Sequence, residues 1–279
     1  MPRTKTLKFD EIGYWSEVKL DIIKDYASEY TKILSKQKYI KKYVYIEGFS
    51  GCGKHLSKTT GQLISGSPVN ALKTKPAFSE YYFIDSDKIK TDYLEKEIKN
   101  YTNAHILNDN CNVALLKKIF PKIQYSNFAR GLCVLDPYGL QLNWEVIKTA
   151  GQLKTIDIFL NFPVMDINRR VLWHNPDKIP QEYIEPMNAF WGDDSWKQVA
   201  YTKDKNLFKF VEKEDTEVII NAFQKRLKEI AGFGYVPNPI PMRNSKNSIV
   251  YYLFFASQKP VADTIIKHIF NKYKNRGVN

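Results

Sequence analysis

The stretch YVYIEGFSGCGKH, residues 43–55, decides how the rest of the sequence is interpreted. Its aromatic and β-branched residues 43–46 predict a short buried strand. Glu47 ends that strand, and the glycines that follow permit the tight backbone turn that a nucleotide- or cofactor-binding loop needs. The stretch therefore predicts the first strand and first loop of an α/β fold.

Similar apolar runs recur along the chain and alternate with helical patterns, as in a mostly parallel sheet between two layers of helices. Because the carboxyl ends of parallel strands share one edge of the sheet, Asp85, Asp109 and Asp136 are expected to meet in one crevice there. Further strands are predicted at 81–84, 104–107, 132–135 and 156–162, and helices at 14–37, 89–99, 144–153 and about 261–273.

The glycine turn supports two interpretations. Between Gly48 and Lys54 it nearly matches the phosphate-binding P-loop of NTPases, but His55 stands where a magnesium-binding Ser or Thr belongs. Residues 61–68, which contain two glycines and a proline, are also poor material for the helix that a P-loop enters. The P-loop NTPase stays open as an alternative.

The other interpretation is the first motif of a class I methyltransferase, whose cofactor is S-adenosylmethionine. There an acid ends the first strand and small residues let the backbone approach the cofactor, as in residues 47–53 (EGFSGCG). Asp85 would accept the ribose hydroxyls, and Asp109 would lie near the adenine. The alternative is that the glycine turn is purely structural and binds no ligand, and that the aspartates cap helices. The predicted cofactor-binding residues are Glu47, Gly48, Phe49, Gly51, Gly53, Asp85 and Asp109.

The exit of the fourth predicted strand has the sequence LDPYG, residues 135–139, which resembles the Asp-Pro-Pro-Tyr motifs of amino-group methyltransferases. An amine conjugated to a ring is a weak nucleophile, because its lone pair is delocalised. Asp136 and a backbone carbonyl would accept its N–H groups, Pro137 would stiffen the loop, and Tyr138 would stack on a planar substrate. These three are the predicted catalytic residues, against the alternative of an ordinary strand-end turn. No metal site is predicted.

The chain is expected to fold as a single domain, residues 1–279, with a helical insertion. Arg169, Arg170 and Trp191 in the insertion are predicted to bind substrate. The predicted parts are a Rossmann-like cofactor-binding core at 40–163, an aromatic-rich insertion over the crevice at 164–235, and an antiparallel sheet edge with a final helix at 236–279.

The composition is that of a soluble, basic protein with a formal net charge of +12. A positive field attracts nucleic acid, but lysine-rich helices also serve solubility, so the charge leaves nucleic acid binding open. No run approaches the roughly 18 apolar residues of a membrane span, and no secretory signal is apparent. A cytoplasmic location without a membrane partner is expected.

A family resemblance rests on eight segments of the sequence. They are 13–17 (GYWSE), 47–55, 66–68 (GSP), 83–85 (FID), 135–140 (LDPYGL), 159–166 (FLNFPVMD), 188–193 (NAFWGD) and 241–245 (PMRNS). Together these segments resemble the three-Cys-motif partner (TcmP) family, over nearly the whole chain. The sequence differs from the family at Lys54, where the family has a small residue. The resemblance implies a bacterial or archaeal protein that acts with a partner bearing a cysteine motif of iron–sulfur type, and it supplies no established reaction.

The sequence as a whole predicts an α/β, Rossmann-like class I methyltransferase fold, with a mostly parallel seven-stranded sheet between helices. The predicted function is methyl transfer from S-adenosylmethionine to an amino group, with a nucleobase or nucleic acid as a candidate acceptor. A non-catalytic binding partner that keeps the same fold is the second alternative, beside the P-loop NTPase.

Overall fold

The structure, a computed structural model, describes residues 7–203, 211–213 and 215–274. Its centre is a seven-stranded sheet of order β11-β12-β8-β7-β2-β5-β6. β12 runs antiparallel to both of its neighbours, and the other six strands are parallel to one another. The predicted fold class is confirmed. The strands are β2 (Lys42–Gly48), β5 (Glu80–Asp85), β6 (Ala104–Asn108), β7 (Ala129–Leu135), β8 (Ile156–Phe162), β11 (Ile240–Arg243) and β12 (Ile249–Ala256).

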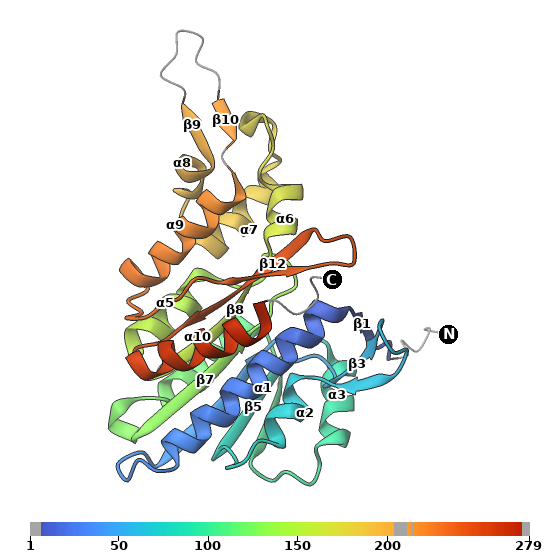
Figure 1. Ribbon diagram of the computed structural model, residues 1–279, viewed down its shortest axis with the longest axis vertical. Coiled ribbons are helices and arrows are strands. Elements are labelled where there is room, and N and C mark those ends of the chain that lie inside the picture. Colours follow the sequence, from blue (N-terminus) through green and yellow to red (C-terminus); the bar gives the residue numbers. More distant parts are fainter. Residues whose placement is uncertain (1–6, 204–210, 214, 275–279) are drawn as a thin grey trace.

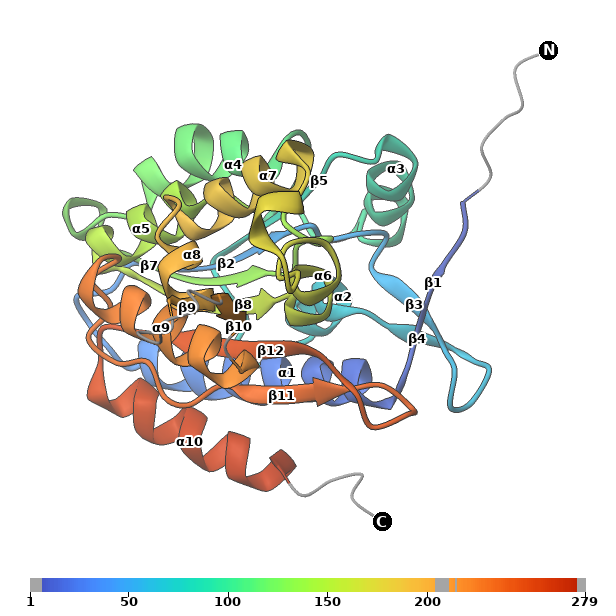
Figure 2. The same cartoon turned by 90° about the horizontal axis from the view of Figure 1, so that it is seen from above.

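Helices cover both faces of this sheet (Figures 1 and 2). Side chains alternate between the faces along each strand, so that Tyr45 packs with α1 and α10 while Val44 and Ile46 pack with α5 and α9. The first face carries α1 (Tyr14–Leu34), α2 (Ser67–Leu72), α3 (Lys88–Glu97) and α10 (Pro260–Lys274), and the second carries α4 (Cys111–Ala114), the short helices η1 (Leu115–Ile119), η2 (Phe120–Lys122) and η3 (Tyr125–Asn127), and α5 (Trp144–Leu153). No helix in the described ranges is both long and apolar enough to cross a membrane.

The segment between β8 and β11 gathers at one end of the molecule (Figure 1). Residues 204–210 and 214 of the predicted insertion lie outside the described residues. Its elements are α6 (Val164–Arg170), η4 (Pro176–Lys178), α7 (Gln181–Trp191), α8 (Trp196–Ala200), β9 (Tyr201–Lys203), β10 (Val211–Lys213) and α9 (Thr216–Glu229).

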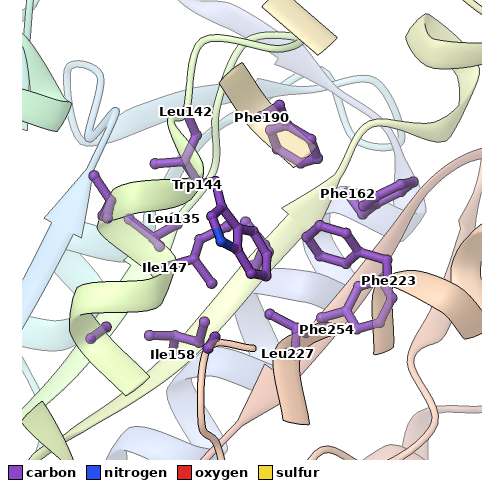
Figure 3. Packing of buried hydrophobic residues seen from close by; sticks show 14 of the residues in the cluster. Leu135, Leu142, Trp144, Ile147, Ile158, Phe162, Phe190, Phe223, Leu227 and Phe254 are labelled. Carbon is purple, nitrogen blue, oxygen red and sulfur yellow. The ribbon is translucent and has the colours of Figure 1, made fainter. Parts of the chain in front are cut away.

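Aromatic side chains of this segment fill the core on the second face of the sheet. The rings of Phe190 and Phe223 stack with centroids 5.7 Å apart, and Phe223 also contacts Trp144, Phe162 and Phe254 (Figure 3). Burying each such ring contributes roughly 2–3 kcal/mol to stability. The aromatic residues predicted to lie over the crevice therefore serve largely as core packing.

The C-terminal strands differ from the prediction in one respect. The strand predicted at the antiparallel edge, β12, is antiparallel but lies inside the sheet, because β11 pairs on its outer side. β11 contains Pro241 and is short, so it lacks a clear strand pattern; proline is tolerated in such an edge strand.

A small second sheet follows the glycine turn, where a helix is usual in nucleotide-binding folds. Its order is β1-β3-β4, and helix α2 begins only at Ser67. This arrangement removes the structural context of a P-loop, in which the turn leads directly into a helix. The strands are β1 (Asp10–Ile12), β3 (Lys54–Ser57) and β4 (Leu63–Ser65).

Candidate functional site

The glycine turn after β2 has an unusual backbone. Phe49, Gly51 and Gly53 all have positive φ, at 64°, 63° and 76°, and such a conformation is costly for the non-glycine Phe49. It lets the Ser50 amide donate to the Ile84 carbonyl oxygen at 2.9 Å, which fastens the turn to the end of β5.

A cavity of about 450 Å³, here called the first cavity, lies at the carboxyl ends of β2, β7 and β8. Its volume lies within the range typical of small-molecule sites. The predicted residues Phe49, Gly51, Pro137 and Tyr138 line it. Its polar lining includes Lys19, Glu47, Ser50, Asp136, Asn161 and Arg169.

Glu47 is buried in the first cavity. Its carboxylate accepts hydrogen bonds from the Tyr45 hydroxyl, at 2.9 Å, and from the Ser67 hydroxyl at the start of α2. Burial raises the pKa of Glu47 to about 8, although the hydrogen bonds from Ser67 and Tyr45 act in the opposite direction. A cationic ligand group beside Glu47 would therefore favour its ionised form.

Asp136 lies opposite, at the exit of β7. One carboxylate oxygen pairs with the Lys19 ammonium, and the other accepts from Asn161 Nδ2 at 2.6 Å. Burial lowers the pKa of Lys19, but the Asp136 carboxylate together with Tyr251 and Glu47 raises that pKa above its ordinary value. Asp136 is the more accessible partner of this pair: 36% of its side chain is exposed, whereas the Lys19 side chain is only 10% exposed.

Unpartnered polar atoms show where a ligand would fit. In the described part of the chain, the buried Ser50 hydroxyl and Asn161 Oδ1 have no hydrogen-bond partner, and both residues line the first cavity. Buried polar groups are normally paired, because leaving one unpaired costs about 1–3 kcal/mol. With Glu47 and Lys19, the Ser50 hydroxyl suits the ammonium and carboxylate of an amino acid, such as the methionine end of S-adenosylmethionine, and Asn161 Oδ1 is left to accept from a second ligand.

Tyr138 is held by residues from distant parts of the chain. Its hydroxyl lies 3.0 Å from both Lys90 Nζ and Asp10 Oδ2, which are themselves 2.7 Å apart. The residue is 52% exposed, so its ring is accessible while its hydroxyl is fixed. Tyr138 is therefore suited to stack on a planar group.

The two predicted ribose and adenine ligands do not line the first cavity. Asp85 is buried, and its carboxylate accepts the amides of Gly51 and Asp87, both at 2.8 Å. Asp109 pairs with Lys118 at 2.7 Å, and its pKa is lowered by that bond. The shared crevice expected for Asp85, Asp109 and Asp136 therefore contains only Asp136 of the three.

Three further predicted residues lie outside this cavity. A Cβ on Gly48 would meet the Cys111 sulfur at 2.4 Å, and one on Gly53 would meet Leu94 at 2.6 Å, so these glycines permit close packing. Trp191 is fully buried, and its indole donates to the Ser195 hydroxyl at 3.0 Å. The expectation that Trp191 contacts substrate is corrected, because the ring is enclosed by the core.

Lys54, the residue that makes the turn similar in sequence to a P-loop, does not line the first cavity. Its ammonium lies 2.6 Å from the Glu97 carboxylate and over the Tyr93 ring, both on α3. Lys54 therefore contacts α3 in place of a phosphate site. Nor do the described ranges contain a cluster of His, Cys, Asp or Glu able to hold a metal ion.

The neighbours Arg169 and Arg170 on α6 line different cavities. Arg169 lines the first cavity, and Arg170 lines a second cavity of about 660 Å³. Tyr138, Gly139 and Asp166 line both, so the two cavities share a wall.

Sequence reasoning missed Lys19 and Ser67. Lys19 lies between the buried residues Val18 and Leu20 of an amphipathic helix, and a lysine at a buried helix position is a signal for a paired charge. Ser67 carries no comparable signal, since its role depends on where α2 begins. Asn161, at the exit of β8, contacts Asp136 directly.

Of the comparisons with known proteins, only the one with solved structures found similar chains. No family model and no curated protein matches the chain. Among solved structures, a protein of Legionella pneumophila str. Philadelphia 1, described with the family model DUF519, is similar with a TM-score of 0.50 and 12% identity, over 92% of this chain and 93% of that one. The chain has an α/β, Rossmann-like methyltransferase fold with a mostly parallel seven-stranded sheet.

Two named methyltransferase structures align less closely. A SAM-dependent methyltransferase of the DUF858 family from Leishmania major has a TM-score of 0.38 and 9% identity, over 86% of this chain and 72% of that one. A dimethyladenosine transferase from Plasmodium falciparum has a TM-score of 0.38 and 15% identity, over 87% and 62%. Membership in the TcmP family rests on the sequence segments alone and stays a prediction.

Proposed function

We propose that the protein is an S-adenosylmethionine-dependent methyltransferase that acts on an amino group. The observation that carries this proposal is that Glu47 and Asp136, from neighbouring strand exits, line one cavity beside the glycine turn. Bound S-adenosylmethionine would supply a methyl group on a positively charged sulfur. The residues of the chain would bind the cofactor, orient the acceptor amine and accept the proton that this amine releases.

The amino-acid end of the cofactor fits the inner part of the first cavity. Ionised Glu47 would bind its ammonium, the Lys19 ammonium would bind its carboxylate, and the unpartnered Ser50 hydroxyl would complete the contacts. Asp85 and Asp109 have no role in this proposal, because neither lines the first cavity.

The acceptor amine would lie between Asp136 and Asn161. Asn161 Oδ1 is unpartnered, and each Asp136 oxygen keeps a lone pair beyond its present bond, so this side of the cavity offers acceptors for an N–H group of the amine. The nitrogen lone pair would form the new N–CH₃ bond, and the electron pair of the S–CH₃ bond would stay on sulfur. The nitrogen then releases one proton, which Asp136 would accept. Orientation of this kind contributes several kcal/mol to catalysis.

Isothermal titration with S-adenosylhomocysteine tests the proposal. We expect micromolar binding that weakens at least about tenfold in Glu47→Gln, because a charge-assisted hydrogen bond is lost. The matched control is Asp109→Ala, an exit carboxylate outside the cavity, which should bind as the wild type does. Absence of binding at millimolar ligand would contradict the proposal.

A non-catalytic binding partner is the second candidate, favoured by one observation. Both Asp136 oxygens are already bonded within the chain, as expected of an idle site. The resemblance to TcmP proteins would then point to complex formation with a partner of iron–sulfur type. Co-purification of such a partner with a chain that binds no S-adenosylhomocysteine would favour this candidate, and binding of the cofactor product would oppose it.

A further inference from the structure

The second cavity is notable for polar side chains that the protein leaves unused. Asp166, Arg170, Glu182 and Tyr183 line it, and none of these four side chains has a hydrogen bond or ion pair within the described ranges. They come from α6 and α7.

A comparable pair of charges on α10 does form an ion pair. Lys267 and Asp263, four residues apart on α10, lie 2.6 Å apart. Asp166 and Arg170 are also four residues apart on a helix, where an ion pair is geometrically available, yet they form none. The charges around the second cavity are therefore free to bind a ligand.

The remaining lining suits a flat ligand. Tyr138, with its hydroxyl fixed by Asp10 and Lys90, lies on the wall shared with the first cavity, and Tyr183 lines the same space. Leu140 and Pro186 add apolar surface. Aromatic rings with apolar neighbours bind planar heterocycles by stacking, and such contacts tolerate any base. The polar groups must therefore provide the selectivity.

We propose that the second cavity is the acceptor subsite and that it selects guanine among the bases that carry an exocyclic amine. This inference rests on the proposed function and names its substrate. Asp166 and Glu182 are carboxylates, which only accept hydrogen bonds. Guanine offers them a continuous row of donors, the ring N–H and the exocyclic amine, while its O6 and N7 accept from an arginine fork such as Arg170.

The other amino-bearing bases match this lining less well. Adenine and cytosine each place a ring nitrogen that accepts hydrogen bonds beside their amine, and a carboxylate would repel it. Because Asp166 lies on the shared wall, its bonds to the donor edge would direct the amine of guanine towards Asp136 in the first cavity.

Binding of nucleoside monophosphates to the full chain, saturated with S-adenosylhomocysteine, tests this selectivity by calorimetry. We expect GMP to bind at least about tenfold more tightly than AMP, as one bidentate contact predicts. IMP keeps the ring N–H, O6 and N7 but lacks the amine, so it should bind more weakly than GMP. AMP binding as tightly as GMP, or IMP equal to GMP, would overturn the inference.

Failure of the inference is distinguishable from failure of the proposed function. A chain that binds S-adenosylhomocysteine but not GMP refutes only the acceptor subsite. A chain that binds no S-adenosylhomocysteine refutes the methyltransferase itself.

Two variants of α7 localise the binding. Glu182 lines the second cavity, whereas Glu185, one turn later, accepts from Gln181 at 3.3 Å and does not line it. Glu182→Gln should weaken GMP binding about tenfold and leave S-adenosylhomocysteine affinity unchanged, which also shows that the variant is folded. Glu185→Gln should bind GMP as the wild type does. Equal losses in both variants would mean a general charge effect and would overturn the assignment.

Discussion

The exits of β2 and β7 differ from those of β5 and β6, although all four lie along one edge of the sheet. Glu47 and Asp136 line the first cavity, whereas Asp85 binds backbone amides and Asp109 binds Lys118. A strand end brings a carboxylate to the edge of the sheet, but the turn that follows decides what the carboxylate binds. The exits of β2 and β7, whose carboxylates line the first cavity, are called open exits and can serve a ligand. The exits of β5 and β6, whose carboxylates bind other groups of the chain, are called closed exits and stabilise the fold.

The largest expected effect concerns the protonation of Glu47 at an open exit. Its folded-state pKa of about 8 lies above the ordinary value of 4.5, so the folded protein keeps a proton that the unfolded chain releases. Stability should therefore fall as pH rises, by roughly 1.4 kcal/mol per pH unit between about pH 5 and 8. Glu47→Gln removes this contribution. Urea unfolding at pH 5, 7 and 9 measures the difference, and parallel pH dependences in the two proteins would contradict it.

At a closed exit, Asp85→Ala should destabilise the fold by about 3 kcal/mol. The buried Gly51 amide would lose its acceptor, at about 1–3 kcal/mol, and the less buried Asp87 amide would lose a hydrogen bond that contributes about 1 kcal/mol. Asp87→Ala is the matched control, since it removes only the N-cap of α3 and should cost about 1 kcal/mol. Denaturant titration of both variants checks the order, and equal losses would show that Asp85 does not tie down the turn.

The ion pair of Lys19 and Asp136 should respond unequally to its two truncations. Asp136→Ala leaves the buried Lys19 ammonium without its partner and should cost about 2 kcal/mol. Lys19→Met leaves a carboxylate that water reaches and should cost about 1 kcal/mol. Unfolding free energies at pH 7 measure both, and the reverse order would mean that Asp136 is the more deeply buried partner.

The smallest effect is expected at the outermost closed exit. Asp109→Ala removes an ion pair with Lys118, whose side chain is 56% exposed, and such pairs contribute less than about 1 kcal/mol. Thermal unfolding should hardly change. A marked loss of stability would show that Asp109 supports the β6 exit in a way that its visible contacts do not explain.

Much of the fold was predictable because it depends on local patterns. The runs at 43–46, 81–84 and 156–162 are apolar enough to specify buried strands, and each lies within an observed strand. β11 was not predictable, because its pattern is interrupted by Pro241 and its place in the sheet is determined by pairing with β12.

The candidate site was predictable only in part, because side-chain direction depends on turn geometry and on distant elements. Asp85 was expected to bind a ligand. Instead its carboxylate accepts from the Gly51 amide, which the positive φ values at Phe49 and Gly51 bring close to it. Lys19 reaches Asp136 across 117 positions of sequence, a contact that no local motif encodes. Trp191 is a residue type that often stacks on planar ligands. Its burial depends on the packing of distant residues, which the local sequence does not indicate.

The triad of Tyr138, Lys90 and Asp10 has a consequence for how the molecule folds. Its bonds join residues separated by 48, 80 and 128 positions, so the two consecutive chain segments 10–90 and 90–138 must both close before all three bonds form. Contacts between such remote residues carry a large loop-closure entropy and tend to form late in folding. The aromatic face offered by Tyr138 would then be completed only in the last folding steps, and partially folded chains would lack it.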